Sequence, residues 1–238
     1  MKRTIYLIGM MVCLLVAASC EKEERYDYRG GNQIYFANEE DSMTYSFAIQ
    51  KSSVREDVVE IPVAISGLAA DEDRVVRVAV VSETTTAIEG DAQSGGHFRL
   101  GETVLRQGEI TANIPVTVYR QDDLKDKEVV VCLQLVCEGT FLGDMVEDKL
   151  AYKLKINDIL SMPANWNSYI RHYFGEYGPV KYQFIIDILG IAEFPESGPD
   201  AVSKAEMGYY KDKLRNALIA YEKENGYLYE EGNVRVTF

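Results

Sequence analysis

The chain has very little of the material from which most catalytic and metal sites are built. Its 238 residues include two histidines, His97 and His172, one tryptophan and four cysteines. The motifs HExxH, GxSxG, the Walker glycine loop and a paired CxxC do not occur. Nucleophilic catalysis needs a nucleophile, a base and an orienting group in contact, and no pattern signals such a set. We therefore expect a protein that is not an enzyme and that carries no resident cofactor.

Basic residues are also scarce. There are 25 Lys and Arg residues against 38 Asp and Glu residues, which gives a formal net charge of −13. The acidic residues are spread along the chain and form no separate tail. Such a surface repels phosphate backbones, so nucleic acid is excluded as a partner. Apolar content of 47% is enough for a sizeable core, and the length allows one or two domains.

Long hydrophobic runs are missing as well. The one apolar run, from Ile5 to Ala18, follows Lys2 and Arg3 and ends in small residues just before Cys20. It is shorter than the ~20 residues that span a bilayer. The pattern predicts an export signal over residues 1–19, and the thiol of Cys20 is a nucleophile that can accept diacylglycerol. The alternative is an ordinary secretory signal with an incidental cysteine.

The residues around the cleavage site resemble a bacterial lipobox, although Ala17 stands where leucine is usual. Lipid chains on Cys20 would contribute ~0.8 kcal/mol of membrane affinity for each buried methylene, which is enough for permanent anchoring. Residues 20–31 form an acidic tether that begins with Glu21-Lys22-Glu23-Glu24. This run resembles the surface-export tag of Bacteroidetes lipoproteins, and the alternative is a solvated tether. The resemblance implies a lipid-anchored protein on the outer face of the outer membrane.

Cleavage removes two basic residues and no acidic ones, so the mature net charge becomes −15. Cys13 leaves with the signal, and Cys132 and Cys137 remain in a strand-like run. Their odd separation points them to opposite faces of a sheet, so a direct bridge would need a bulge. The export compartment permits a disulfide, but we expect two free thiols.

Residues 32–158 are rich in apolar residues at every second position. This alternation runs through six segments, which are 43–49, 59–65, 76–80, 110–118, 129–135 and 152–156. Turn clusters such as Ser66-Gly67 and Gln107-Gly108 separate them. Period-two placement with β-branched residues is typical of strands that bury one face. We predict an antiparallel β-sandwich of about seven strands over residues 32–158.

Residues 159–238 lack the regular alternation of residues 32–158, and their sequence predicts a small α+β domain. The one clear helix is expected from about Val202 to Asn225, with Gly226 as its C-cap. Residues 181–189 are apolar enough for either a helix or a strand. The last twelve residues, 227–238, predict a hairpin that turns at residues 231–233.

Two resemblances follow from these residues. Thr86-Ala87-Ile88-Glu89-Gly90-Asp91, followed by Gly108-Glu109-Ile110 and Ile114-Pro115-Val116, resembles the Calx-β sandwich pattern, with the usual aromatic displaced to Phe98. The mature chain also resembles an uncharacterised Bacteroidetes surface lipoprotein family. That resemblance is carried by Trp166-Asn167-Ser168, the run from Gly175 to Tyr182 and Phe184-Ile185-Ile186. Members of such families are encoded beside SusC/SusD uptake pairs, which implies an accessory role in nutrient capture.

An aromatic cluster in the C-terminal segment is the candidate contact site. Its members are Trp166, Tyr169, Tyr173, Tyr177 and Tyr182. Aromatic residues are enriched at interface hot spots, and exposed rings also stack on sugars. The alternative is that these rings form the core of the small C-terminal domain.

A few acidic residues are candidate ligands for calcium. Glu89, Asp91, Asp122 and Asp123 fall in inter-strand loops, and Ca²⁺ takes clustered oxygen ligands. The alternative is that these are solvated acids suited to turn geometry.

Together, these observations predict a non-catalytic accessory subunit of a SusC/SusD-like complex for glycan or peptide uptake. It would be anchored at the outer membrane through Cys20. The competing hypothesis is a free-standing surface module that binds glycans or peptides.

Overall fold

A computed structural model describes residues 32–139, 141–142 and 149–238. The predicted signal peptide, Cys20 and the acidic tether lie outside these residues. Within the described ranges, no helix combines the length and the apolar character needed to cross a membrane.

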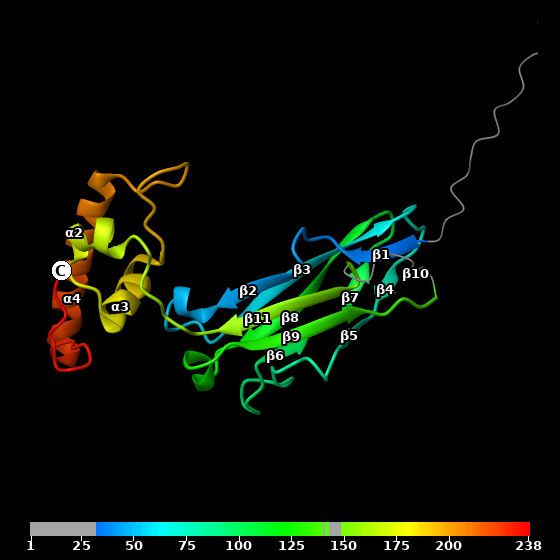
Figure 1. Ribbon diagram of the computed structural model, residues 1–238, viewed down its shortest axis with the longest axis horizontal. Coiled ribbons are helices and arrows are strands. Elements are labelled where there is room, and N and C mark those ends of the chain that lie inside the picture. The colour runs from blue at the N-terminus through cyan, green and yellow to red at the C-terminus, as the bar shows by residue number, and fades with distance from the viewer. Residues whose placement is uncertain (1–31, 140, 143–148) are drawn as a thin grey trace, which may run out of the picture. The chain divides into compact units, whose positions relative to one another are not determined.

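The first part of the chain is a stack of β-sheets (Figure 1). A five-stranded sheet has the order β10-β1-β3-β8-β6, a four-stranded sheet has the order β2-β11-β9-β5, and β4 pairs with β7. The strands are β1 (Asn32–Phe36), β2 (Ser42–Ser46), β3 (Glu56–Ser66), β4 (Arg74–Val76), β5 (Val78–Val80), β6 (Phe98–Leu100), β7 (Thr103–Leu105), β8 (Thr111–Tyr119), β9 (Val129–Leu135), β10 (Phe141–Leu142) and β11 (Ala151–Asn157). Two short 3₁₀ helices, η1 (Phe47–Ile49) and η2 (Asp122–Lys125), lie between strands.

The long strands bury one face each, as their alternation predicts. Apolar residues of β3, β8, β9 and β11 at every second position belong to one buried cluster, which is Val59, Ile61, Val63, Ile65, Ile114, Val116, Val118, Val129, Val131, Leu133, Leu135, Tyr152, Leu154 and Ile156. Both larger sheets contribute to this cluster, so it forms the core of a sandwich. The predicted fold class, a mainly antiparallel β-sandwich, is confirmed.

The short strands differ from the prediction. Residues 76–80 do not form one strand, because the chain leaves the β4–β7 sheet after Val76 and joins the four-stranded sheet at Val78. The first predicted segment, 43–49, is a strand only as far as Ser46, because η1 begins at Phe47. The strand before it, β1, was not predicted; β1 pairs with β3 in one sheet and β2 pairs with β11 in the other. The pairs β1–β10 and β2–β11 are parallel, while the other pairs are antiparallel. Strands of two or three residues are too short to show a period of two, so β6, β7 and β10 were not predicted.

Helices dominate the C-terminal part. A π-helical turn, η4 (Trp166–Ile170), leads into α2 (Arg171–Phe174), and α3 (Pro179–Leu189) and α4 (Lys204–Asn225) follow. The predicted helix is α4, and the ambiguous run 181–189 lies in α3. The predicted hairpin turns at Gly232 and Asn233, but in the described residues its two arms share only an isolated bridge between Tyr229 and Arg235.

Local signals explain where these helices begin and end. Ser203 caps α4 in a capping box with Glu206, and Gly226 ends α4 as its C-cap. Pro179 begins α3, where a missing N–H is tolerated.

The N-terminus of α3 is capped from a distant segment. Its backbone N–H groups at Val180 and Lys181 donate to the Glu230 carboxylate at 3.0 and 2.7 Å. A Cβ at Gly178 would lie 2.2 Å from Glu230 Cδ, so glycine is required for this approach. An acidic group at a helix N-terminus is stabilising, and Glu230 therefore fixes the last residues of the chain against α3.

The C-terminal helices have a hydrophobic cluster of their own. Its buried members are Trp166, Tyr169, Ile170, Phe174, Tyr182, Phe184, Ile185, Ile186, Ala192, Phe194, Met207, Leu214, Leu218 and Val236. None of these residues belongs to the sandwich cluster. The proposed domain limits of 32–158 and 159–238 remain a prediction.

Candidate functional site

Most of the predicted aromatic contact site lies in the interior. Trp166, Tyr169 and Tyr182 are buried, and their rings meet neighbouring aromatic rings edge to face, as between Trp166 and Tyr182 at 5.5 Å. Buried rings cannot present themselves to a partner or a sugar, so the predicted contact role is wrong for these three residues. These three residues instead belong to the hydrophobic core of the C-terminal segment, which was the alternative interpretation.

The polar atoms of these three rings are satisfied within the protein. Trp166 Nε1 donates to the Gly175 carbonyl at 3.1 Å, and Tyr169 donates its hydroxyl to the Val202 carbonyl at 2.8 Å. The Tyr182 hydroxyl donates to the Ala192 carbonyl at 2.7 Å. Burial raises the pKa of Tyr182 to about 12. Satisfied donors in an apolar setting are typical of structural aromatics.

The other two predicted contact residues are only partly buried. Tyr173 and Tyr177 pack against the edge of the same cluster, and the Tyr177 ring lies 5.1 Å from that of Trp166. Burial raises the pKa of the Tyr177 hydroxyl. These two rings support the core and leave one edge accessible.

The candidate calcium ligands do not come together as a cation site. No group of three or more His, Cys, Asp or Glu side chains within the described ranges could hold a metal ion. Asp91 lies 3.6 Å from Arg99, and Asp122 lies 3.3 Å from Lys125. Glu89 is exposed next to Phe98, with which it shares a backbone bridge.

Asp123, the last of these acids, holds a buried histidine. Burial opposes its ionisation, but bonds from Lys127 and His97 outweigh burial and keep the Asp123 pKa below its usual value. His97 Nδ1 accepts from the Ile88 N–H at 3.0 Å, so Nε2 carries the proton and donates to Asp123 at 3.1 Å. Because both ring nitrogens are engaged, the pair fixes the loop before β6 and leaves no free base.

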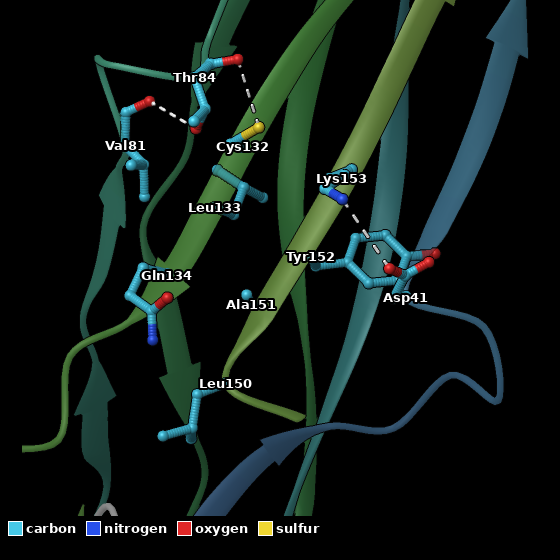
Figure 2. Close-up of a pocket in the computed structure, with 10 residues that line it drawn as sticks. All are labelled: Asp41, Val81, Thr84, Cys132, Leu133, Gln134, Leu150, Ala151, Tyr152 and Lys153. Atoms are coloured by element: carbon cyan, nitrogen blue, oxygen red, sulfur yellow. Dashed lines mark hydrogen bonds and ion pairs between the residues drawn. The ribbon is translucent and has the colours of Figure 1, made fainter. Parts of the chain in front are cut away.

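A hollow of about 640 Å³ lies over the outer face of the four-stranded sheet (Figure 2). Its lining residues come from β9, β11 and three adjoining loops and are Asp41, Val81, Thr84, Cys132, Leu133, Gln134, Leu150, Ala151, Tyr152 and Lys153. Cys132 and Lys153 are direct cross-strand partners, and Lys153 Nζ lies 3.9 Å from Asp41. The volume falls in the range of small-ligand sites.

Both cysteines of the described residues, Cys132 and Cys137, are free thiols, as predicted. Cys132 donates through Sγ to the Thr84 carbonyl at 3.5 Å, and burial raises the pKa of the Cys137 thiol. A thiol with a raised pKa is mostly protonated at neutral pH and is a poor nucleophile. Of the two cysteines, only Cys132 lines the hollow.

A second, exposed set of aromatic residues lies at the end of the chain. We call Glu222, Tyr227, Tyr229 and Arg235 the tyrosine–arginine patch. The exposed fractions of Tyr227 and Tyr229 are 60% and 42%. The Arg235 guanidinium lies 3.8 Å from the centre of the Tyr227 ring and binds Glu222 through two nitrogens at 3.2 and 2.7 Å.

This patch was not predicted from the sequence, because the contact site was placed where aromatic residues are most closely spaced, in residues 166–182. The signal that was present is the tyrosine at every second position of the predicted hairpin. Period two places Tyr227 and Tyr229 on one side of an extended segment. Arg235 then reaches both, since it stacks on Tyr227 and faces Tyr229 across the bridge.

Comparisons with known proteins give a family and a set of distant structures. The model of a domain of unknown function, DUF4843, matches residues 27–191. No curated protein matches the sequence.

Among solved structures, a two-domain protein of unknown function from Bacteroides fragilis is 14% identical over 53% of this chain and 45% of its own, with a TM-score of 0.38. An auxiliary nutrient binding protein from Bacteroides thetaiotaomicron is 14% identical over 50% of this chain and 44% of its own, with a TM-score of 0.39. The apo-form Calx CBD1 domain is 18% identical over 54% of this chain and 98% of its own, with a TM-score of 0.35. The match thus spans less than half of each Bacteroides chain, and the functional argument does not rest on these likenesses.

Proposed function

This chain belongs to the DUF4843 family of domains of unknown function, and on that premise we propose that it is a lipid-anchored, non-catalytic accessory subunit of a nutrient uptake complex. The complex would be of the SusC/SusD-like kind at the outer membrane. The protein would be held at the cell surface through Cys20 and would contact its partner through the tyrosine–arginine patch.

The patch is the observation that carries the proposal. Tyrosine and arginine are enriched at interface hot spots, where they combine a large contact area with polar groups. Here Arg235 is held by Glu222 and stacks on Tyr227, so these groups are ordered before a partner arrives. Side chains that are already ordered lose less conformational entropy on binding. Glu230, directly after Tyr229, fixes this segment against α3.

The test is co-purification of the tagged full-length protein from detergent-solubilised outer membranes. We expect the native protein to bring down a large barrel protein in stoichiometric amount. Tyr227→Ser combined with Tyr229→Ser should weaken this association by about thirtyfold or more, since a single hot-spot side chain contributes about 2 kcal/mol or more. The measurement is the ratio of the two proteins in the eluate.

The matched control is Tyr209→Ser. Tyr209 is an exposed tyrosine near the start of α4, and Glu222 lies thirteen residues further along, about 20 Å at the rise of an α-helix. This control should retain the partner. If the double variant also retains it fully, the contact lies elsewhere on the chain, and if the native protein brings down no barrel protein, the subunit proposal is wrong.

The membrane attachment is tested separately. We expect Cys20→Ala to abolish lipid attachment, because alanine has no nucleophile to accept diacylglycerol, and the protein should leave the membrane fraction. Fractionation by ultracentrifugation with immunoblotting measures this change, and protease treatment of intact cells reports whether the native protein faces outward. A Cys20→Ala variant that still sediments wholly with outer membranes would rule out the lipid anchor.

The hollow over β9 and β11 favours a second candidate, a free-standing module that binds a glycan or peptide. Gln134, Lys153 and Asp41 offer donors and acceptors around a hollow of suitable size. The co-purification experiment separates the two candidates, because only the first requires a stoichiometric partner.

A further inference from the structure

The side chain of Arg74 is a buried positive charge with no partner in the described part of the chain. Its exposed fraction is 6%, and Nε, Nη1 and Nη2 all lack a hydrogen-bond acceptor among those residues. A guanidinium does not lose its proton in a protein. An unpaired buried charge is strongly destabilising, so native proteins pair such groups.

Two acidic residues near Arg74, Asp73 and Glu138, are engaged elsewhere. Asp73 accepts from Arg106 Nη1 and from the Gln107 N–H, both at 2.8 Å. Glu138 binds Arg77 at 3.0 Å on the exposed side. Neither carboxylate balances the charge of Arg74.

A second unsatisfied polar group lies on the same face. Thr103 of β7 is buried, and its hydroxyl also has no partner among the described residues. In the β4–β7 pair Arg74 stands opposite Leu105 and Val76 stands opposite Thr103, so Arg74 and Thr103 are diagonal neighbours. Such neighbours lie about 7–8 Å apart, which is within the reach of an arginine side chain.

Phe141 of β10 adjoins this pair of groups and a cavity. The Arg74 guanidinium lies over the Phe141 ring at 5.1 Å from its centre, a cation–π contact that orients the planar group. The same ring lines a cavity of about 360 Å³ together with Val75, Arg77, Val136, Glu138 and Gly139. This cavity is large enough for a small organic acid.

We propose that Arg74 and Thr103 form a buried binding site for a small oxyanion, a carboxylate or a phosphate. The guanidinium donates two parallel hydrogen bonds to the oxygens of the anion, the geometry that arginine favours, and the Thr103 hydroxyl donates a third. The ligand is a small anion such as acetate or phosphate, because neither Arg74 nor Thr103 lines the cavity beside Phe141. This site is independent of the tyrosine–arginine patch, so it stands or falls separately from the proposed function.

The experiment is calorimetric melting of the mature protein in sodium acetate, sodium phosphate or sodium chloride at equal ionic strength. A ligand that binds only the folded state raises Tm with its concentration. We expect Tm to rise by about 3–6 °C for each tenfold increase in the bound anion above its dissociation constant. A rise in acetate indicates a carboxylate ligand, and a rise in phosphate alone indicates a phosphate ligand.

Two variants assign the effect to this site. Arg74→Met should abolish the dependence on the anion, whereas Arg99→Met, which removes an exposed arginine away from this site, should keep it. Thr103→Val removes one hydrogen bond to the anion and should weaken its affinity about tenfold, which tests the site even if Arg74→Met does not fold. If the native protein melts at the same temperature in all three salts, or if Arg74→Met responds as the native protein does, the proposal is wrong.

One further variant distinguishes a ligand from a carboxylate of the chain itself. Asp144, Glu147 and Asp148 lie outside the described residues, and all three can be replaced by their amides. If acetate raises Tm only in that triple variant, the chain supplies the anion internally and the proposal of an external ligand is overturned. If the native protein responds equally, the proposal stands.

Discussion

Replacing Asp158 by alanine is expected to lower the free energy of unfolding by about 3–5 kcal/mol, the effect of breaking one partner of a buried ion pair. Asp158 follows β11, and its carboxylate accepts from Arg120 Nε and Nη2 at 2.8 and 2.7 Å. The exposed fractions of the two side chains are 8% for Arg120 and 3% for Asp158. Removing the carboxylate would therefore leave a buried guanidinium without its counter-charge.

Arg120 cannot easily move to solvent, because other contacts hold it. Its Nη1 donates to the Lys51 carbonyl at 3.1 Å, and its guanidinium lies over the Phe47 ring at 5.8 Å. The loss should appear in urea unfolding followed by circular dichroism near 215 nm, where β-sheet absorbs.

Two controls separate burial from ion pairing as such. In the ion pair between Glu138 and Arg77, the side chains are 63% and 70% exposed. Glu138→Ala breaks this exposed pair and should change the free energy of unfolding by only about 0–1 kcal/mol. The double variant Arg120→Met, Asp158→Leu removes both charges and should be more stable than Asp158→Ala alone. If Asp158→Ala and Glu138→Ala prove equally mild, Arg120 is solvated and the expected penalty is absent.

Trp166→Ala should have an effect of similar size in the C-terminal helices, about 3–5 kcal/mol. The Trp166 side chain is fully buried, its Nε1 donates to the Gly175 carbonyl, and Tyr177 and Tyr182 meet it edge to face. Alanine would leave a large cavity and an unsatisfied carbonyl. Thermal unfolding followed at 222 nm measures the loss, because the long helices α3 and α4 lie in this part of the chain.

The matched control is Tyr209→Ala, an exposed aromatic on α4 that should change stability by no more than about 0.5 kcal/mol. This experiment also tests the correction made above. A Trp166→Ala protein that keeps its stability but loses its partner would return Trp166 to the interface and contradict its burial.

The helices at the C-terminus could be predicted only in part. Apolar residues recur every three to four positions along α4, and Gly226 ends the helix. The helix and its C-terminal end can therefore both be predicted from the local sequence. The π-helical turn η4 and α2 are short and aromatic, and no period distinguishes them from a loop. Glu230, which caps the N-terminus of α3, lies fifty residues after Val180. The sequence around α3 therefore could not predict this cap.

The sequence by itself determined the acidic charge and the long strands, and the export signal stays a prediction from sequence. Alternation in β3, β8, β9 and β11 is a local property of each segment, because a strand with one buried face needs an apolar residue at every second position. The two free thiols were also predicted, but the spacing argument assumed a single strand, and Cys137 lies two residues beyond the end of β9.

Only the tertiary structure decided which groups are available for function. Trp166 and Tyr227 are both aromatic residues of the C-terminal segment, yet the Trp166 ring is buried and the Tyr227 ring is exposed. Burial depends on which helices pack around a residue. His97 is satisfied by Asp123, twenty-six residues away, whereas Arg74 finds no such partner among the described residues. Pairing and burial depend on residues that are distant along the chain, and a periodic pattern carries no information about them.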